Sequence, residues 1–212
     1  MPMNTMKPTA LLISALLVGG LAQAQDAIAP EAAKAASELA ATTCSVCHGP
    51  AGRNSSPIFP NLAGQSALYL ETQLKAFRDQ TRADPDAQAY MWGMASQLKD
   101  EQIAAIAAHY AAQAPAEGHR GDAKLVEKGR VIFEQGVPAK GIPACGSCHG
   151  AKAQGNGPFP RLAGQHSGYL IKQILVIQNA LRAAPVMHGV IKDLTRDQML
   201  QVAAYLESIG PS

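Results

Sequence analysis

The sequence predicts an all-α protein made of two similar domains in tandem. Apolar residues recur in several segments with the spacing of an amphipathic helix, and no segment shows the alternation typical of a strand. A long motif also occurs twice, about 100 residues apart. A chain of 212 residues has room for two small domains.

The N-terminus has the pattern of a secretory signal peptide. Lys7 precedes a short apolar run, residues 11–21, and Ala22-Gln23-Ala24 is a small-residue cleavage site. The run is too short to span a bilayer, although an uncleaved membrane anchor is the alternative interpretation. We expect residues 1–24 to be cleaved during export.

The repeat divides the rest of the chain into two domains. We expect an N-terminal domain over residues 25–114 and a C-terminal domain over residues 115–212. They are joined by a linker at about residues 114–124, which is rich in Pro, Gly and charge and reads as a solvated connection. Domains this small bury only a modest core, so a bound group at the centre would add apolar volume.

Three main helices are expected in each domain. Ile103, Ile106 and Tyr110 fall on one face of the last helix of the N-terminal domain, and Thr195 with Gln198 forms a capping box in the C-terminal domain. Stretches rich in Gly, Pro and Asn separate the first and second helices as shaped loops. The expected helices span residues 30–42, 69–78 and 100–112, and then residues 125–135, 169–181 and 195–209.

Each domain contains one C-x-x-C-H motif, the attachment signal for a c-type haem. Two thiols add to the two haem vinyl groups, and the following His becomes the proximal ligand of the iron. The two copies hold all four cysteines of the chain. They are Cys44-Ser45-Val46-Cys47-His48 and Cys145-Gly146-Ser147-Cys148-His149.

Two other readings of the cysteines are a redox disulfide and a four-cysteine zinc site. Neither requires a His directly after the second cysteine, whereas both copies have one. The pattern therefore favours two covalent haem c groups. Export supports this, because haem c is attached outside the bacterial plasma membrane, and it places the protein in the periplasm.

A Met on the open side of each iron would close the site to small molecules and favour an electron carrier. The repeat selects Met91 and Met187, since each lies seven residues before a Leu that precedes the last helix. Met94 aligns with Val190, which cannot bind iron. His188 is a weaker alternative to its neighbour Met187.

The repeated motif after each haem signal has a supporting role. It reads F-P-x-L-A-G-Q at residues 59–65 and again at residues 159–165. A ligating imidazole usually donates its second N–H to a carbonyl, and a loop containing Pro60 or Pro160 can hold such a carbonyl rigidly. Arg161 could pair with a haem propionate, whereas its counterpart Asn61 carries no charge.

Other repeated residues have two possible roles, either contacts to haem propionates or contacts between the domains. They are Tyr69, Gln73, Tyr169 and Gln173.

Charge is unevenly distributed between the predicted domains. Residues 25–114 carry six basic and nine acidic side chains, a net of −3, and residues 115–212 carry eleven and seven, a net of +4. The mature protein is therefore expected to be an electrostatic dipole, unless these charges serve only solubility. An exported chain without a basic cluster is not expected to bind nucleic acid.

With these motifs the chain resembles dihaem cytochromes c of the cytochrome c4 type, over essentially all of residues 25–212. The resemblance implies two class I cytochrome c domains related by a pseudo-twofold axis, each wrapped around one haem with His/Met ligation. It also implies that propionates approach each other across the domain interface. One departure is Lys99, which stands where the second copy has the capping residue Thr195.

The function expected from these features is one-electron transport in the periplasm, without catalysis. The resemblance implies a monomeric, at most loosely membrane-associated carrier. Its redox partners would be a quinol–cytochrome c oxidoreductase complex and a haem-copper terminal oxidase or reductase. One rival is the dihaem subunit of a larger periplasmic dehydrogenase, such as a flavoprotein sulfide dehydrogenase. A dihaem peroxidase-type or thiosulfate-oxidising enzyme is less favoured, because it needs an open axial position.

Overall fold

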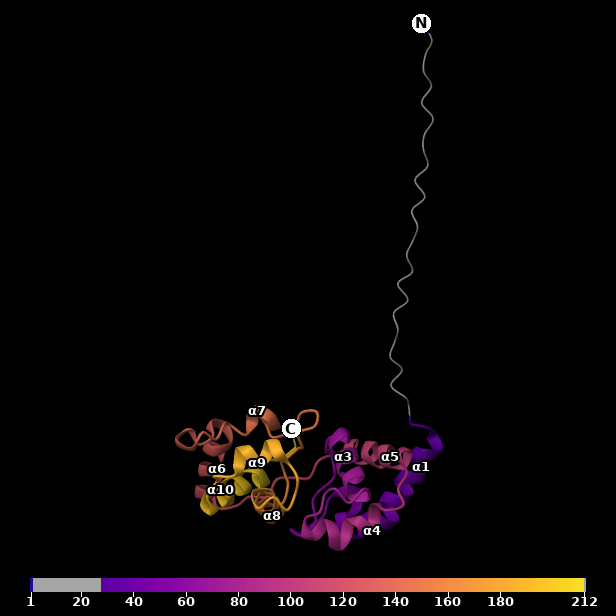
Figure 1. Ribbon diagram of the computed structural model, residues 1–212, viewed down its shortest axis with the longest axis horizontal. Coiled ribbons are helices and arrows are strands. Elements are labelled where there is room, and N and C mark those ends of the chain that lie inside the picture. The colour runs from indigo at the N-terminus through magenta and orange to yellow at the C-terminus, as the bar shows by residue number, and fades with distance from the viewer. Residues whose placement is uncertain (2–27, 212) are drawn as a thin grey trace.

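The computed structural model describes residue 1 and residues 28–211, so the predicted signal peptide lies outside the described part except for its first residue. The described residues form helices and loops, with isolated bridges at Val137–Ile142 and Asn156–Phe159 and no strand. Two helical bodies lie side by side (Figure 1). The described part of the chain contains no helix that is long and apolar enough to cross a membrane.

Each body contains five α-helices. The first has α1 (Pro30–Leu39), α2 (Ser45–His48), α3 (Ala67–Arg78), α4 (Trp92–Ala95) and α5 (Asp100–Ala111). The second has α6 (Ala123–Gln135), α7 (Gly146–His149), α8 (Ser167–Gln178), α9 (Pro185–Ile191) and α10 (Arg196–Ser208). The six predicted helices correspond to α1, α3, α5, α6, α8 and α10, within three residues at each end.

Four short helices were not predicted: α2 and α7 at the haem motifs, and α4 and α9 before the last helix of each domain. Helices of four to seven residues show too few turns for apolar periodicity to be recognised. They matter for the site, because Met91 ends the π turn before α4 and Met187 lies in α9.

The two haem motifs are reached differently. Helix α1 continues through a π turn, Ala40–Cys44, directly into α2. Helix α6 ends at Gln135, where Gly136 adopts φ 72°, and an insertion with the Val137–Ile142 bridge precedes α7. The predicted helix over residues 125–135 ends where expected, because the glycine stops it ten residues before Cys145.

The first and last helices of each domain pack together, α1 on α5 and α6 on α10. The N-terminal core is built largely from alanines, such as Ala36 and Ala107, whereas the C-terminal core uses larger residues, such as Phe133. Helix α6 approaches α10 closely at Gly129, where a Cβ would lie 2.0 Å from the Gln201 carbonyl oxygen. The glycine therefore permits this helix crossing.

The loops after the haem motifs have unusual backbone conformations. Gly49, with φ 75°, ends α2, and a Cβ there would lie 2.0 Å from the carbonyl oxygen of Arg53. Each loop then returns to the last helix of its own domain, where Gly64 N–H donates to Tyr110 O and Gly164 N–H donates to Leu206 O, both at 2.9 Å.

The linker is less solvated than the sequence suggests. Pro115 lies over Gly64, and the carbonyl of Ala116 lies over Gly164, so this short segment packs on both domains. His119 N–H also donates to Glu207 O at 2.9 Å. Small side chains and backbone make these contacts, which apolar periodicity does not reveal.

Candidate functional site

A cavity of about 760 Å³ extends into both domains. Both C-x-x-C-H motifs border it, as do the Met residues selected by the repeat. The cysteines lie in two pairs in different domains, and none of the four forms a disulfide. No group of three or more His, Cys, Asp or Glu residues that could hold a metal ion occurs in the described ranges.

The two predicted proximal histidines have matching surroundings. His48 Nδ1 donates to Pro60 O, and His149 Nδ1 donates to Pro160 O, both at 3.0 Å. A carbonyl oxygen can only accept, so each bond fixes the proton on Nδ1 and leaves a lone pair on Nε2. Burial lowers the pKa of both imidazoles, which favours the neutral form that binds iron.

The cysteines are half-buried beside these histidines. Burial raises the pKa of the Cys145 thiol to about 11, and it also raises the pKa of Cys44. The thiols border a large apolar cavity, where thioether bonds to haem vinyl groups would replace them.

The Met residues differ in exposure. Met91 and Met187 are half-buried and pack against the hydrophobic clusters of their own domains, while Met94 is 55% exposed. His188 does not border the cavity, and its Nδ1 donates to Ile177 O at 2.8 Å. Met94 borders the cavity as Met91 does, whereas His188 does not. The geometry therefore disfavours His188, and the choice of Met91 over Met94 stays a prediction that rests on the repeat.

Arg161 provides a test of whether this cavity fits a haem. Its side chain is buried and borders the cavity, and its Nε and Nη2 have no hydrogen-bond partner in the protein. A buried guanidinium without a partner is unfavourable, and a haem propionate would supply the missing carboxylate. The N-terminal counterpart Asn61 is already satisfied by Asn54 N–H and Gly164 O, both at 3.0 Å.

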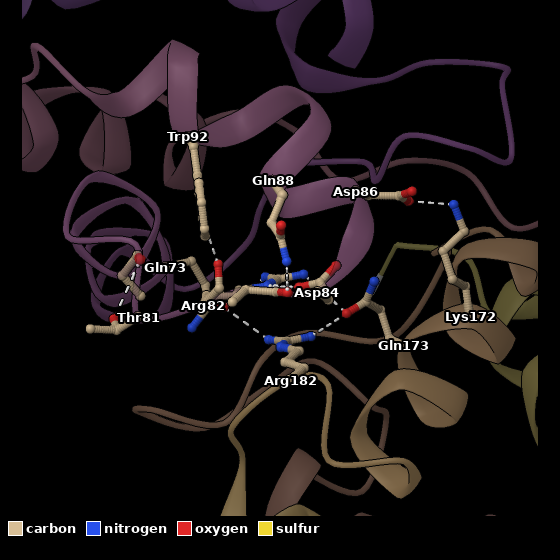
Figure 2. Close-up of polar contacts among 12 residues, drawn as sticks. Gln73, Thr81, Arg82, Asp84, Asp86, Gln88, Trp92, Lys172, Gln173 and Arg182 are labelled. Carbon is tan, nitrogen blue, oxygen red and sulfur yellow. Dashed lines mark hydrogen bonds and ion pairs between the residues drawn. The ribbon is translucent and has the colours of Figure 1, made fainter.

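Two further buried arginines lie where the domains meet (Figure 2). Arg82 donates to Gln73 Oε1 at 2.7 Å and to Gln173 Oε1 at 3.0 Å. Arg182 donates to the same two oxygens, at 2.9 Å and 2.6 Å, and to Tyr69 Oη at 2.8 Å. Tyr69, Gln73 and Gln173 therefore make contacts between the domains, which is one of the two roles left open for them.

The arginine network is not symmetric. Arg82 Nε donates to the carboxylate of Asp84 at 2.9 Å, and Asp84 is only 1% exposed. The position equivalent to Asp84 is Ala184, and Arg182 has no ion pair within the described ranges. None of these three residues was predicted from the sequence, although the two arginines lie 100 residues apart, as the repeated motif does, and that spacing is a signal for them.

The described residues thus fit two covalently attached haems. Each domain supplies two thiols, a neutral imidazole with a free Nε2, and a thioether on the cavity wall. A haem placed there supplies reversible one-electron chemistry at its iron. The protein orients each imidazole through a proline carbonyl and keeps most of the surrounding surface apolar.

Known proteins share this arrangement. The family model of cytochrome c matches the chain twice, over residues 33–111 and 126–210. Cytochrome c-552 of Acidithiobacillus ferridurans is 45% identical over 206 residues, which cover 95% of this chain and 87% of that protein. A thiosulfate dehydrogenase electron acceptor of Thiomonas intermedia is 36% identical over 185 residues, 84% of this chain and 83% of that protein.

A solved structure of cytochrome c4 from Acidithiobacillus ferrooxidans superposes with a TM-score of 0.74 at 46% identity, covering 78% of this chain and 98% of that one. The family model, the relatives and the two-domain fold agree with the paired haem motifs. The chain therefore belongs to the cytochrome c family, as a dihaem electron-transfer cytochrome of the c4 type with two covalent haem c groups.

Proposed function

We propose that this cytochrome carries single electrons through the periplasm between respiratory complexes, toward a terminal oxidase, and that it has no catalytic site of its own. The observation that carries this proposal is the presence of a second axial donor in each domain. With Met91 and Met187 on the cavity wall, neither iron has an open position for a substrate.

The proposal includes a ligand set for each haem, which the same geometry supports. Cys44 and Cys47 attach the first haem, and His48 and Met91 bind its iron. In the second domain the corresponding residues are Cys145, Cys148, His149 and Met187. The carbonyls of Pro60 and Pro160 orient the two imidazoles, as the bonds at 3.0 Å support.

The basic C-terminal half is the proposed docking side for an acidic acceptor. Not every lysine there is available, however. Lys172 forms an ion pair with Asp86 across the domain interface, so it is not assigned to docking (Figure 2). Lys152 is exposed and has no ion pair among the described residues. Electrostatic steering by such residues acts mainly on the association rate.

The proposal is tested by electron-transfer kinetics with purified complexes. Reduced by a quinol–cytochrome c oxidoreductase, the protein should pass electrons to a haem-copper oxidase, with a second-order rate that falls as salt rises. Lys152→Glu should lower that rate at low salt, whereas Lys34→Glu, in the other domain, should not. An unchanged rate and salt dependence for Lys152→Glu would remove the docking assignment.

A second candidate is the electron acceptor of a periplasmic dehydrogenase. Similarity to the Thiomonas intermedia thiosulfate dehydrogenase electron acceptor favours it. Co-purification with a dehydrogenase and reduction by that enzyme faster than by the quinol-oxidising complex would select this candidate. Carbon monoxide binding to the reduced native protein would instead show an open iron and support an enzyme.

A further inference from the structure

The domains are joined by two glutamine side chains that each contact a backbone segment of the other domain. Gln165 Oε1 accepts from Asn61 N–H at 2.9 Å, and Gln165 Nε2 donates to Asn61 O at 3.0 Å. Gln65 repeats the arrangement, with Oε1 accepting from Arg161 N–H at 2.7 Å and Nε2 donating to Arg161 O at 3.0 Å. We call these four bonds the glutamine clamp.

The clamp is buried. Gln65, Gln165, Asn61 and Arg161 are each only 6–7% exposed. Water therefore does not compete for these bonds, and the low local dielectric strengthens them. Each glutamine oxygen also accepts from the next residue of its own chain segment, Ser66 N–H at 3.0 Å or His166 N–H at 3.1 Å, which fixes the amide orientation.

Each clamped residue shares a peptide group with a proline carbonyl of the site. Asn61 N–H and Pro60 C=O belong to one peptide, and that carbonyl accepts from His48 Nδ1 at 3.0 Å. The chain of hydrogen bonds therefore runs from His48 through the 60–61 peptide to Gln165 of the other domain. An equivalent chain runs from His149 through the 160–161 peptide to Gln65.

Hydrogen bonds in such a chain polarise one another. A bond accepted by Gln165 from Asn61 N–H places more negative charge on the Pro60 oxygen, and this strengthens the bond from His48 Nδ1. A more strongly hydrogen-bonded imidazole is a more basic ligand, which favours the oxidised iron. Losing the glutamine contact should therefore favour the reduced iron in the opposite domain.

We propose that Gln65 and Gln165 are positioning residues that act across the domain interface, each tuning the haem of the other domain through the peptide that holds its proximal histidine. The docking of the two domains thereby becomes part of the redox tuning of both irons. This inference rests on the proposed ligation by His48 and His149.

The test uses the holo-protein with Gln165→Leu and Gln65→Leu. The reduction equilibrium of each haem is followed separately, by the hyperfine-shifted haem methyl resonances during a redox titration. Gln165→Leu should shift the N-terminal haem toward the reduced state by about threefold or more, where tenfold corresponds to 59 mV for a one-electron couple. The C-terminal haem should shift less. Gln65→Leu should shift the C-terminal haem toward the reduced state by a similar factor, and the N-terminal haem should shift less.

Two variants separate tuning from a loosened interface. Ser66→Ala removes a neighbouring interdomain bond, from Ser66 Oγ to Gly157 O at 2.7 Å, but leaves the hydrogen bonds of the 60–61 and 160–161 peptides in place. It should therefore leave the reduction equilibria of both haems unchanged. Gln165→Glu keeps the acceptor and adds negative charge, so it should shift the N-terminal haem toward the oxidised state. If Gln165→Leu does not fold, Gln165→Asn, whose amide is one methylene short, gives the same readout.

Shifts confined to the haem of the mutated domain, equal shifts of both haems, or a Ser66→Ala effect of the same size would overturn the inference. Failure of the proposed ligation would look different, because the spectrum of the unmodified protein would then lack the signature of His/Met coordination.

Discussion

The N-terminal and C-terminal domains agree in the parts that hold a haem and differ in the parts that surround it. Both orient the motif histidine with a proline carbonyl at 3.0 Å, and both contribute one half of the glutamine clamp. Some equivalent positions beside the shared cavity differ, and three of these differences change charge or polarity. They are Asn61 and Arg161, Asp84 and Ala184, and Tyr110 and Leu206.

These differences change the charge beside each haem. The N-terminal pocket has the buried carboxylate of Asp84, which pairs with Arg82. The C-terminal pocket has the buried cation Arg161, and Arg182 next to the interface has no carboxylate partner among the described residues. Because a nearby cation stabilises the haem that has gained an electron, we expect the second haem to have the higher reduction potential. The two domains thus share the contacts that hold a haem, while different residues around those contacts are expected to give the two haems different reduction potentials.

The largest effect should come from removing an axial ligand in one domain only. Met91→Ala is expected to lower the potential of the first haem by on the order of 0.1 V or more, since axial ligands move haem potentials over about 0.8 V. It should also allow carbon monoxide to bind one reduced haem. Optical titration and carbon monoxide difference spectra check this. Met94→Ala is the matched control, and an equal effect of that variant would contradict the assignment of Met91.

Gly129→Ala tests the packing difference between the domains. A Cβ at this position would clash with the backbone of Gln201, so α6 and α10 must move apart. Overpacking of this kind costs about 1–3 kcal/mol, and we expect the C-terminal domain to lose that stability in denaturant unfolding while the N-terminal domain does not. Gly189→Ala, which lies in α9 and meets no atom within 4 Å, should instead be neutral or stabilise by up to about 1 kcal/mol, because Ala favours a helix more than Gly does. Equal destabilisation by both variants would argue against the close crossing.

Asp84→Asn tests the charge difference. Removing the carboxylate while keeping its hydrogen-bonding shape should raise the potential of the first haem by about 40 mV, the equivalent of about 1 kcal/mol at an effective dielectric of about 20. The gap between the two potentials should narrow. A redox titration that resolves both haems measures it, and a wider gap would show that the order of potentials proposed here is reversed.

The smallest effect concerns the start of the last helix in each domain. Thr195 Oγ1 accepts from Gln198 N–H at 3.3 Å, whereas Lys99 has no side-chain acceptor and only its backbone N–H is capped, by Gln102 at 2.9 Å. Lys99→Thr should therefore stabilise the N-terminal domain by about 0.5–1 kcal/mol. Thr195→Ala should destabilise the C-terminal domain by about 1 kcal/mol. Thermal unfolding of each variant would detect both changes in stability. If Lys99→Thr does not stabilise the N-terminal domain, the bond from Lys99 N–H to Gln102 is enough to cap α5.

Local sequence patterns predicted the features that depend on local structure. Apolar periodicity located the six main helices, and C-x-x-C-H located both pairs of thiols with their histidines. Comparison within the repeat singled out Met91, and this choice stays a prediction, because Met91 and the more exposed Met94 both border the cavity. These predictions needed no knowledge of how the domains pack.

The features that the sequence did not predict depend on contacts between distant residues. The bond from Asn61 N–H to Gln165 joins residues 104 positions apart, and no periodicity reports such a contact. Arg82 and Arg182 are repeated, but their shared partners appear only once the domains are docked. The linker contact between Pro115 and Gly64 could not be predicted from apolar periodicity either, because a proline ring packs there on the backbone of a glycine.

The glutamine clamp is self-complementary, since the loop containing Gln65 meets the loop containing Gln165 through the same atoms in both directions. Contacts of this kind are those of an isologous, twofold interface between identical subunits. Here both subunits lie in one chain, and the short linker keeps each at a high effective concentration for the other. The molecule therefore resembles a dimer whose two subunits are covalently joined by the linker. Because the two halves are encoded separately in one chain, each can have different residues around its own haem.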